Sequence, residues 1–460
     1  MRHIFLLVIL LITAQNLVFS QNLKKFWVTF TDKDSSSFDI SQPSEYLSPR
    51  ALERRANQNI PISENDLPVN DNYLLELKKL GVNIHNTSKW LNASSIVATD
   101  SIVALIKDLS FVDTVKYVGK HQINSIFLKK TGKQRDSTEF SFLLDSLHGY
   151  ADEQIQMVKG KYLHNNGYRG ASKMIAVLDG GFSNVDIMAF FDSLRVHGKL
   201  SYQKDFVDGD NYVYESSSHG SQVLSVMGAN IPGFMVGTAP DATYVCLKTE
   251  DTRGEYLIEE CNWVAALEYA DSLGVDVVNS SVGYTTFNDK DMNHHYDMLD
   301  GNTAIASKAA NIAFAKGMIV VNSAGNDGNG EWKYIDVPAD AIDILTVGAV
   351  NSDGKYARFS SVGPTPDGRV KPEIVALGKG TTVASVYSNK VNRSNGTSFS
   401  SPLIAGMVAS LWDAFPEKTN KEIIEAVVQS ASQFDDPKDK IGYGIPDFYE
   451  AYQILSIKNP

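Results

Sequence analysis

The chain is poor in cysteine and in basic charge. Its 460 residues include two cysteines, Cys246 and Cys261, and 42 lysines and arginines against 54 aspartates and glutamates. Two cysteines exclude a disulfide-built scaffold, because they allow one bridge at most. Their spacing leaves open whether they form that bridge or remain buried thiols. The net charge of -12 argues against nucleic-acid partners, which need a clustered basic surface.

Long apolar runs are also missing, apart from one at the N-terminus. Nine apolar residues, 4–12, follow a charged start and precede a short stretch that ends at Ser20. This pattern is typical of an export signal, and the run is about half the length that a membrane-spanning helix needs. We therefore expect a signal peptide over residues 1–20. The remaining chain is expected to be exported, secreted or periplasmic, with no membrane span after signal removal.

The composition provides enough apolar side chains for a core, with 43% hydrophobic and 10% aromatic residues. Disorder is thereby excluded as the main state. Residues 21–120 show the order strand, helix, strand, strand, helix, strand, which is typical of a ferredoxin-like α+β unit. The expected strands are 25–30, 82–88, 94–99 and 112–118, the helices are 72–80 and 101–109, and an extra helix spans 49–57 with Ser48 as its N-cap. A charged stretch within 121–148 reads as a linker that a protease could cut.

From about residue 150, short buried strands alternate with longer helices. This alternation predicts an α/β fold with a doubly wound, mostly parallel sheet, whose functional residues lie at the carboxyl ends of the strands. The expected strands are 174–178, 243–247, 275–279, 318–322 and 344–350, and the expected helices are 220–228, 257–273, 303–316, 399–413 and 421–430.

Three polar residues lie at such strand ends or helix starts. Asp179 follows a buried strand and precedes two glycines, and His219 begins a helix. Ser398 lies in the hydroxyl-rich segment 395–402, where Pro402 is expected to fix the first turn of the next helix. Each signal is weak alone, since an aspartate before glycine is usually a turn residue.

Together the three residues predict nucleophilic catalysis. A serine hydroxyl needs an imidazole to remove its proton, and the imidazole needs a carboxylate to hold its tautomer. The order Asp179, His219, Ser398 is that of subtilisin. The order Ser-Asp-His is excluded for Ser398, because no histidine follows it.

Residues 150–450 resemble the subtilisin-like serine proteases, or subtilases, on these motifs and on a fourth at 320–328. The resemblance implies an Asp-His-Ser triad that acts through an acyl-enzyme, with Asn326 as a donor to the oxyanion. It also implies extended polypeptide substrates, bound along Ser281, Val282 and Gly283. The pocket for the residue before the scissile bond would be lined by Ser323, Ala324 and Gly325. These small residues suggest a roomy, mostly apolar pocket of broad specificity. No carboxylate is identifiable in the sequence as a selector of basic residues, though the acidic loops could supply one.

The N-terminal part is similar to the propeptides of secreted subtilases from the Bacteroidota, notably at 46–50 and 88–92. The resemblance implies a zymogen with three parts: a signal peptide at 1–20, an inhibitor-type propeptide plus cleavable linker at 21–140, and a catalytic domain at 141–460. The propeptide would act as an intramolecular inhibitor.

Catalysis of this kind requires no cofactor. The loop 289–300, with His294 and His295, and the segment 205–210 contain potential metal ligands, but their spacing favours solvated loops over metal sites. Structural calcium, common in subtilases, is possible but not assignable. The alternative to an exported serine endopeptidase is a catalytically silent exported pseudoprotease that binds peptides; such a protein would not need the triad or Asn326.

Overall fold

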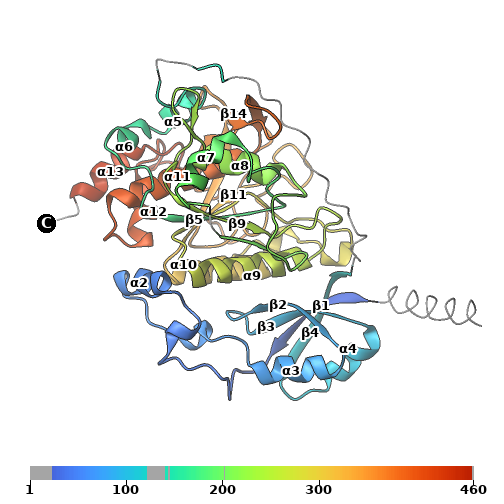
Figure 1. Cartoon of the computed structure of the whole chain (residues 1–460). Helices are drawn as coiled ribbons and strands as arrows, with labels where there is room; N and C mark the ends of the chain where they lie inside the picture. The colour runs from blue at the N-terminus through green and yellow to red at the C-terminus, as the bar shows by residue number, and fades with distance from the viewer. Residues whose placement is uncertain (1–22, 122–139, 143–145, 201, 458–460) are drawn as a thin grey trace, which may run out of the picture.

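The computed structural model describes residues 23–121, 140–142, 146–200 and 202–457 (Figure 1). The predicted signal peptide and most of the predicted linker lie outside the described residues. Residues 23–121 form what we call the N-terminal unit, which lies against one side of a larger α/β domain. Within the described parts of the chain, no helix combines the length and apolar character that a membrane crossing requires.

The N-terminal unit is built on a four-stranded antiparallel sheet with the order β2-β3-β1-β4. This is the ferredoxin-like order that the sequence predicted. Its helices α3 (Asp71–Lys79) and α4 (Asp100–Lys107) cover one face, where Leu77, Val103 and Ile106 pack on Phe26 and Ile96. The elements are β1 (Lys24–Phe30), α2 (Pro49–Asn57), α3 (Asp71–Lys79), β2 (Asn83–Ser88), β3 (Ala93–Ala98), α4 (Asp100–Lys107) and β4 (Val112–Lys120).

The larger domain is built on a seven-stranded sheet with the order β13-β12-β11-β10-β5-β9-β6. Every neighbouring pair is parallel, which confirms the doubly wound architecture. The strands are β5 (Met174–Asp179), β6 (Tyr202–Asp205), β9 (Thr243–Lys248), β10 (Val277–Ser280), β11 (Ile319–Ser323), β12 (Leu345–Val350) and β13 (Ile374–Leu377). The two edge strands were not predicted, because β6 is polar and β13 has only four residues.

Helices cover both faces of this sheet, because successive side chains of a strand point to opposite sides. Ile175 and Val177 share a buried cluster with α8 and α11, whereas Ala176 and Leu178 share the other cluster with α9 and α10. The helices of the domain are α5 (Asp152–Met157), α6 (Lys161–Asn165), α7 (Asp192–Val196), α8 (His219–Gly228), α9 (Ile258–Leu273), α10 (Ile305–Ala315), α11 (Thr397–Ala414), α12 (Asn420–Gln429) and α13 (Phe448–Ile457). Two small antiparallel pairs, β7 (Asn230–Ile231) with β8 (Met235–Val236) and β14 (Lys379–Ala384) with β15 (Val391–Asn395), complete it.

The sheet of the N-terminal unit packs on α9 (Figure 1). Trp27 of β1 and Trp90, in the turn between β2 and β3, belong to the same buried cluster as Ala265 of α9. Cys261, also on α9, and Cys246 are both buried free thiols, so the pairing that the sequence left open is not formed.

Candidate active site

The carboxyl end of β5 places Asp179 against the first residue of α8. Asp179 is 1% exposed, and its Oδ2 and Oδ1 lie 2.8 and 3.0 Å from Nδ1 of His219. The backbone N–H of Gly180 also donates to Oδ1, at 2.8 Å. A buried carboxylate thus fixes the imidazole through one ring nitrogen and leaves the other for a reacting group.

The His219 pKa is set by two opposing effects. Burial favours the neutral imidazole, but the charge of Asp179 and its hydrogen bond outweigh that effect and raise the pKa of His219. A carboxylate that stabilises the imidazolium is what a general base needs when it accepts a proton from a hydroxyl.

Gly220 explains how α8 can begin so close to β5. A Cβ at Gly220 would lie 2.5 Å from the Gly181 carbonyl oxygen and 3.0 Å from the Asp179 Cβ. Any side chain there would push the helix away from the strand, and His219 would move away from Asp179 with it.

Ser398 is the second residue of α11 and is 8% exposed. Its Oγ donates to the Ser281 carbonyl at 3.3 Å, and the two described side chains of Ser398 and His219 share no hydrogen bond. The His219 ring nevertheless lies 5.6 Å from the ring of Phe399, the residue after Ser398. His219 therefore lies beside the start of the helix that carries Ser398, whose hydroxyl is turned to the backbone. In enzymes without a bound substrate, the hydrogen bond between nucleophile and base is often long or poorly aligned.

The start of α11 corrects one expectation. The helix begins at Thr397, two residues earlier than predicted, so Pro402 lies in its second turn and does not fix the first. Proline has no N–H to donate to the carbonyl four residues before it, which is that of Ser398. Ser281 compensates, because its Oγ donates to the Ser398 carbonyl at 3.0 Å.

Asn326 lies beside the same helix start. Its Oδ1 accepts from the backbone N–H of Thr397 at 2.9 Å and from the Thr397 hydroxyl at 3.2 Å. Because the oxygen is held by two donors, the amide nitrogen is the group left to donate. The Asn326 side chain therefore lies at the start of α11, beside the backbone N–H groups of the first residues of that helix.

The predicted substrate-binding residues form two segments that we call the walls. Residues 281–283 continue from β10 and residues 323–325 lie at the end of β11, and these strands are parallel neighbours. Gly283 is exposed, Val282 is half-buried, and Ser281, Ser323, Ala324 and Gly325 are buried. The Asn322 amide donates to the Val282 carbonyl at 3.4 Å and so links the walls.

The histidine and carboxylate segments weighed as metal ligands have protein partners. His294 is buried, with Nε2 2.6 Å from Oε1 of Glu260, and Asp205 pairs with Lys248 at 2.8 Å. In the described part of the chain, Glu250, Glu255 and Glu259 form the only group of three such ligands within 4.8 Å of one another. An acidic cluster alone identifies no metal, and calcium stays unassigned.

Asp336 is a residue near the walls that the sequence did not reveal. Its carboxyl is buried beside Gly283 and Gly325, but it belongs to no motif and follows no predicted element.

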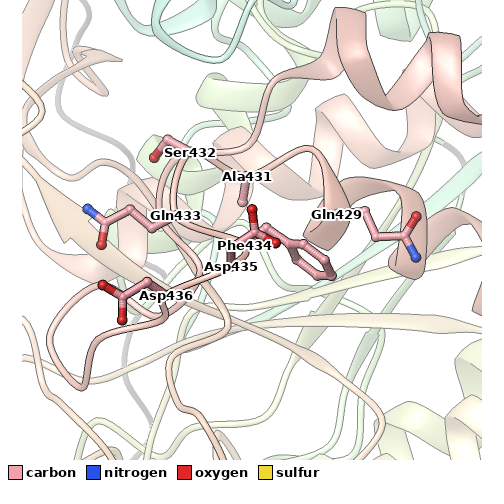
Figure 2. A pocket seen from close by; sticks show the side chains of 7 residues that line it. All are labelled: Gln429, Ala431, Ser432, Gln433, Phe434, Asp435 and Asp436. Carbon is pink, nitrogen blue, oxygen red and sulfur yellow. The ribbon is translucent and has the colours of Figure 1, made fainter.

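A surface pocket elsewhere, at the loop that follows α12, contains none of the predicted site residues. Figure 2 shows its lining by Gln429, Ala431, Ser432, Gln433, Phe434, Asp435 and Asp436.

Comparison with known proteins gives two family matches. A model described as the subtilase family matches residues 170–444, and one described as the peptidase S8 propeptide domain of Bacteroidota matches residues 25–138. Subtilisin DY of Bacillus licheniformis is 30% identical over 286 residues, which cover 61% of this chain and 92% of that relative. Subtilisin NAT of Bacillus subtilis subsp. natto and subtilisin E of Bacillus subtilis (strain 168) are each 29% identical over 293 residues, or 62% of this chain and 68% of each relative.

Proposed function

The chain belongs to the subtilase family of serine endopeptidases, and from that premise we propose that Asp179, His219 and Ser398 are its catalytic triad. The observation that supports this assignment best is the pair of contacts, 2.8 and 3.0 Å, between buried Asp179 and His219. Ser398 is the second residue of α11, and the start of that helix lies beside the imidazole.

In the proposed reaction, the Ser398 hydroxyl turns from the Ser281 carbonyl to Nε2 of His219 and attacks the peptide carbonyl. His219 takes the hydroxyl proton and gives it to the leaving amine, which produces an acyl-enzyme. Water then attacks the ester with His219 again as the base, and the Ser398 hydroxyl is restored. Asp179 remains ionised and holds the imidazole throughout.

The tetrahedral intermediate places a negative charge on the former carbonyl oxygen. We assign its donors to the Asn326 side-chain amide and the backbone N–H of Ser398. The contacts of Asn326 Oδ1 with Thr397 support this role, because they orient the amide without using its N–H groups. Loss of such a donor raises the barrier by about 2.7–4 kcal/mol in subtilisin, the case from which the figure comes.

The family match at residues 25–138 identifies a propeptide domain, which supports an intramolecular inhibitor role. We propose that residues 1–20 are a signal peptide, that 21–140 are the propeptide with its linker, and that 141–460 are the mature enzyme. Its proposed location is outside the cytoplasm, secreted or periplasmic, where it cuts extended polypeptides without a cofactor.

The test compares the chain with its Ser398→Ala variant. Processed wild-type protein should cleave denatured casein and bind a serine-directed organophosphate at Ser398. The variant should lose activity by orders of magnitude and should retain a small residual activity that comes from oxyanion stabilisation. No cleavage by the wild type, together with no label on Ser398, would refute the proposal. A label without cleavage of any peptide would favour the silent peptide-binding protein.

A further inference from the structure

Asp336 belongs to the segment that joins the two walls. Its backbone N–H donates to the Ala324 carbonyl at 3.1 Å. The next residue, Val337, exchanges two backbone hydrogen bonds with Tyr284, at 2.8 and 3.1 Å. Because Ala324 is in one wall and Tyr284 directly follows the other, residues 336–337 link the two walls through backbone hydrogen bonds.

The Asp336 carboxyl lies between the glycines that end the walls. A Cβ at Gly325 would lie 2.3 Å from Asp336 Oδ2, and a Cβ at Gly283 would lie 3.0 Å from the same oxygen. Both walls thus carry no side chain where they face this carboxyl. A larger residue at either position would displace it.

This carboxyl is buried without a partner. Asp336 is 7% exposed, and its Oδ1 has no hydrogen-bond partner among the described residues. Nor does any lysine, arginine or histidine of the described ranges form an ion pair with it. Burial, with a smaller effect of Asp327, raises the pKa of Asp336 well above its ordinary value. Buried polar groups in folded proteins almost always have partners, so one without a partner in a binding pocket points to a donor on the ligand.

We propose that Asp336 selects substrates with arginine or lysine at P1, the residue before the scissile bond. Its carboxylate would receive the guanidinium or ammonium group at the base of the pocket. This inference rests on the proposed endopeptidase function. It replaces the expectation of broad specificity in an apolar pocket with a preference for basic side chains. A guanidinium is the better match, since it presents a planar pair of donors to a carboxylate.

The position of Asp336 relative to the nucleophile agrees with this role. The Thr397 hydroxyl accepts from the Gly325 N–H at 3.2 Å, and its oxygen lies 3.1 Å from the Gly325 carbonyl oxygen. Gly325, which borders the Asp336 carboxyl, is therefore hydrogen-bonded to Thr397, the residue before Ser398. When the carbonyl of the P1 residue lies at Ser398, the side chain of that residue can extend between the walls toward the Asp336 carboxyl. Residues 141–460 also hold 40 acidic and 25 basic residues, a balance that attracts cationic peptides.

The experiment measures kcat/KM of the processed enzyme on peptides that differ only at P1: arginine, lysine, citrulline and phenylalanine. Citrulline has the shape of arginine without its charge. Arginine and lysine should exceed the two neutral residues by at least about a hundredfold, the effect expected of a buried charge pair. Asp336→Asn should lower the arginine-to-citrulline ratio by about that factor, and Asp336→Glu should keep a basic preference.

Asp343→Asn is the matched control, because Asp343 is exposed and the change in charge is the same. Organophosphate labelling of Ser398 counts the active sites in each variant, so a folding defect is not read as a change of specificity. Equal cleavage of arginine and citrulline by the labelled wild type would overturn the inference, as would an unchanged ratio in labelled Asp336→Asn. If that variant gives no labelled enzyme, the wild-type ratio decides. No cleavage of any peptide and no label would refute the endopeptidase proposal itself.

Discussion

Two buried carboxylates in different regions of the molecule have opposite surroundings. Asp271, near the end of α9, is 0% exposed and receives Arg54 at 2.5 Å and Arg55 and Lys89 at 2.9 Å each. Asp336, between the walls, has no cation in the described structure. Burial alone would raise the pKa of Asp271, but the three cations lower it to about 2, whereas the pKa of Asp336 is raised.

The difference lies in where the counter-charges come from. All three cations at Asp271 belong to the N-terminal unit, two of them to α2, which lies beside the end of α9 (Figure 1). The cluster extends through Asp66, which pairs with Arg55 and Lys316 at 2.9 Å each. At Asp271 the chain thus provides its own cations through the propeptide region. At Asp336, by our inference, the substrate provides the cation.

The largest effect should follow from Asp271→Asn. In a full-length Ser398→Ala background, which prevents self-cleavage, this change leaves Arg54, Arg55 and Lys89 buried without their common carboxylate. Breaking a buried ion pair in this way costs about 3–5 kcal/mol. Urea unfolding followed by tryptophan fluorescence should report that loss, since Trp27 and Trp90 lie at this interface.

Asp100→Asn is the control for that experiment. Asp100 pairs with Lys24 at 2.7 Å, but the two side chains are 71% and 41% exposed. A surface pair of this kind contributes at most about 1 kcal/mol. If Asp271→Asn is no more destabilising than Asp100→Asn, the cluster does not hold the N-terminal unit in place.

A pH titration should sharpen the comparison at Asp271. Its folded pKa, about 2, is lower than its ordinary 3.8, so its contribution is present above about pH 4 and is lost as the pH falls toward 2. Between pH 5 and pH 2, the stability difference between the Ser398→Ala protein and its Asp271→Asn derivative should shrink by roughly 2 kcal/mol. A difference that stays constant with pH would mean that Asp271 is not the titrating group.

Asp336 should show a different pH dependence, which is measured as the preference of the enzyme among substrates. Because its pKa is raised, it is ionised only as the pH rises, and its anion is the form that attracts arginine. The arginine-to-citrulline ratio of kcat/KM should therefore increase with pH, by up to about tenfold per unit below that pKa. Titration of His219 cancels in the ratio. The phenylalanine-to-citrulline ratio should stay flat, and a flat arginine-to-citrulline ratio would contradict the assignment.

Local patterns in the sequence predicted much of the fold. The apolar runs gave five central strands of the large sheet, and Ser48 marked the start of α2, where it accepts from the Ala51 N–H at 3.1 Å. The order of Asp179, His219 and Ser398 indicated a family whose membership the comparisons confirm. Their catalytic roles stay a prediction, although Asp179 contacts His219 and His219 lies beside the helix start that carries Ser398.

Contacts between distant segments could not be predicted in this way. Arg54 and Arg55 look like surface residues of a charged helix until α2 lies against α9, more than 200 residues later. Asp336 lies in a loop, and only the fold brings it between Gly283 and Gly325. Sequence reasoning from motifs misses such residues, because their environment comes from several segments at once.

The smallest effect should be that of Asp336→Asn on stability. The raised pKa favours the neutral acid, and no ion pair is broken when an amide of the same size replaces it. We therefore expect a change within about 1 kcal/mol in the Ser398→Ala background, measured by the same urea unfolding as for Asp271→Asn. A loss as large as that of Asp271→Asn would show that Asp336 is ionised and has a partner within the protein. The two carboxylates would then both be structural, and the pocket would need another explanation for its buried acid.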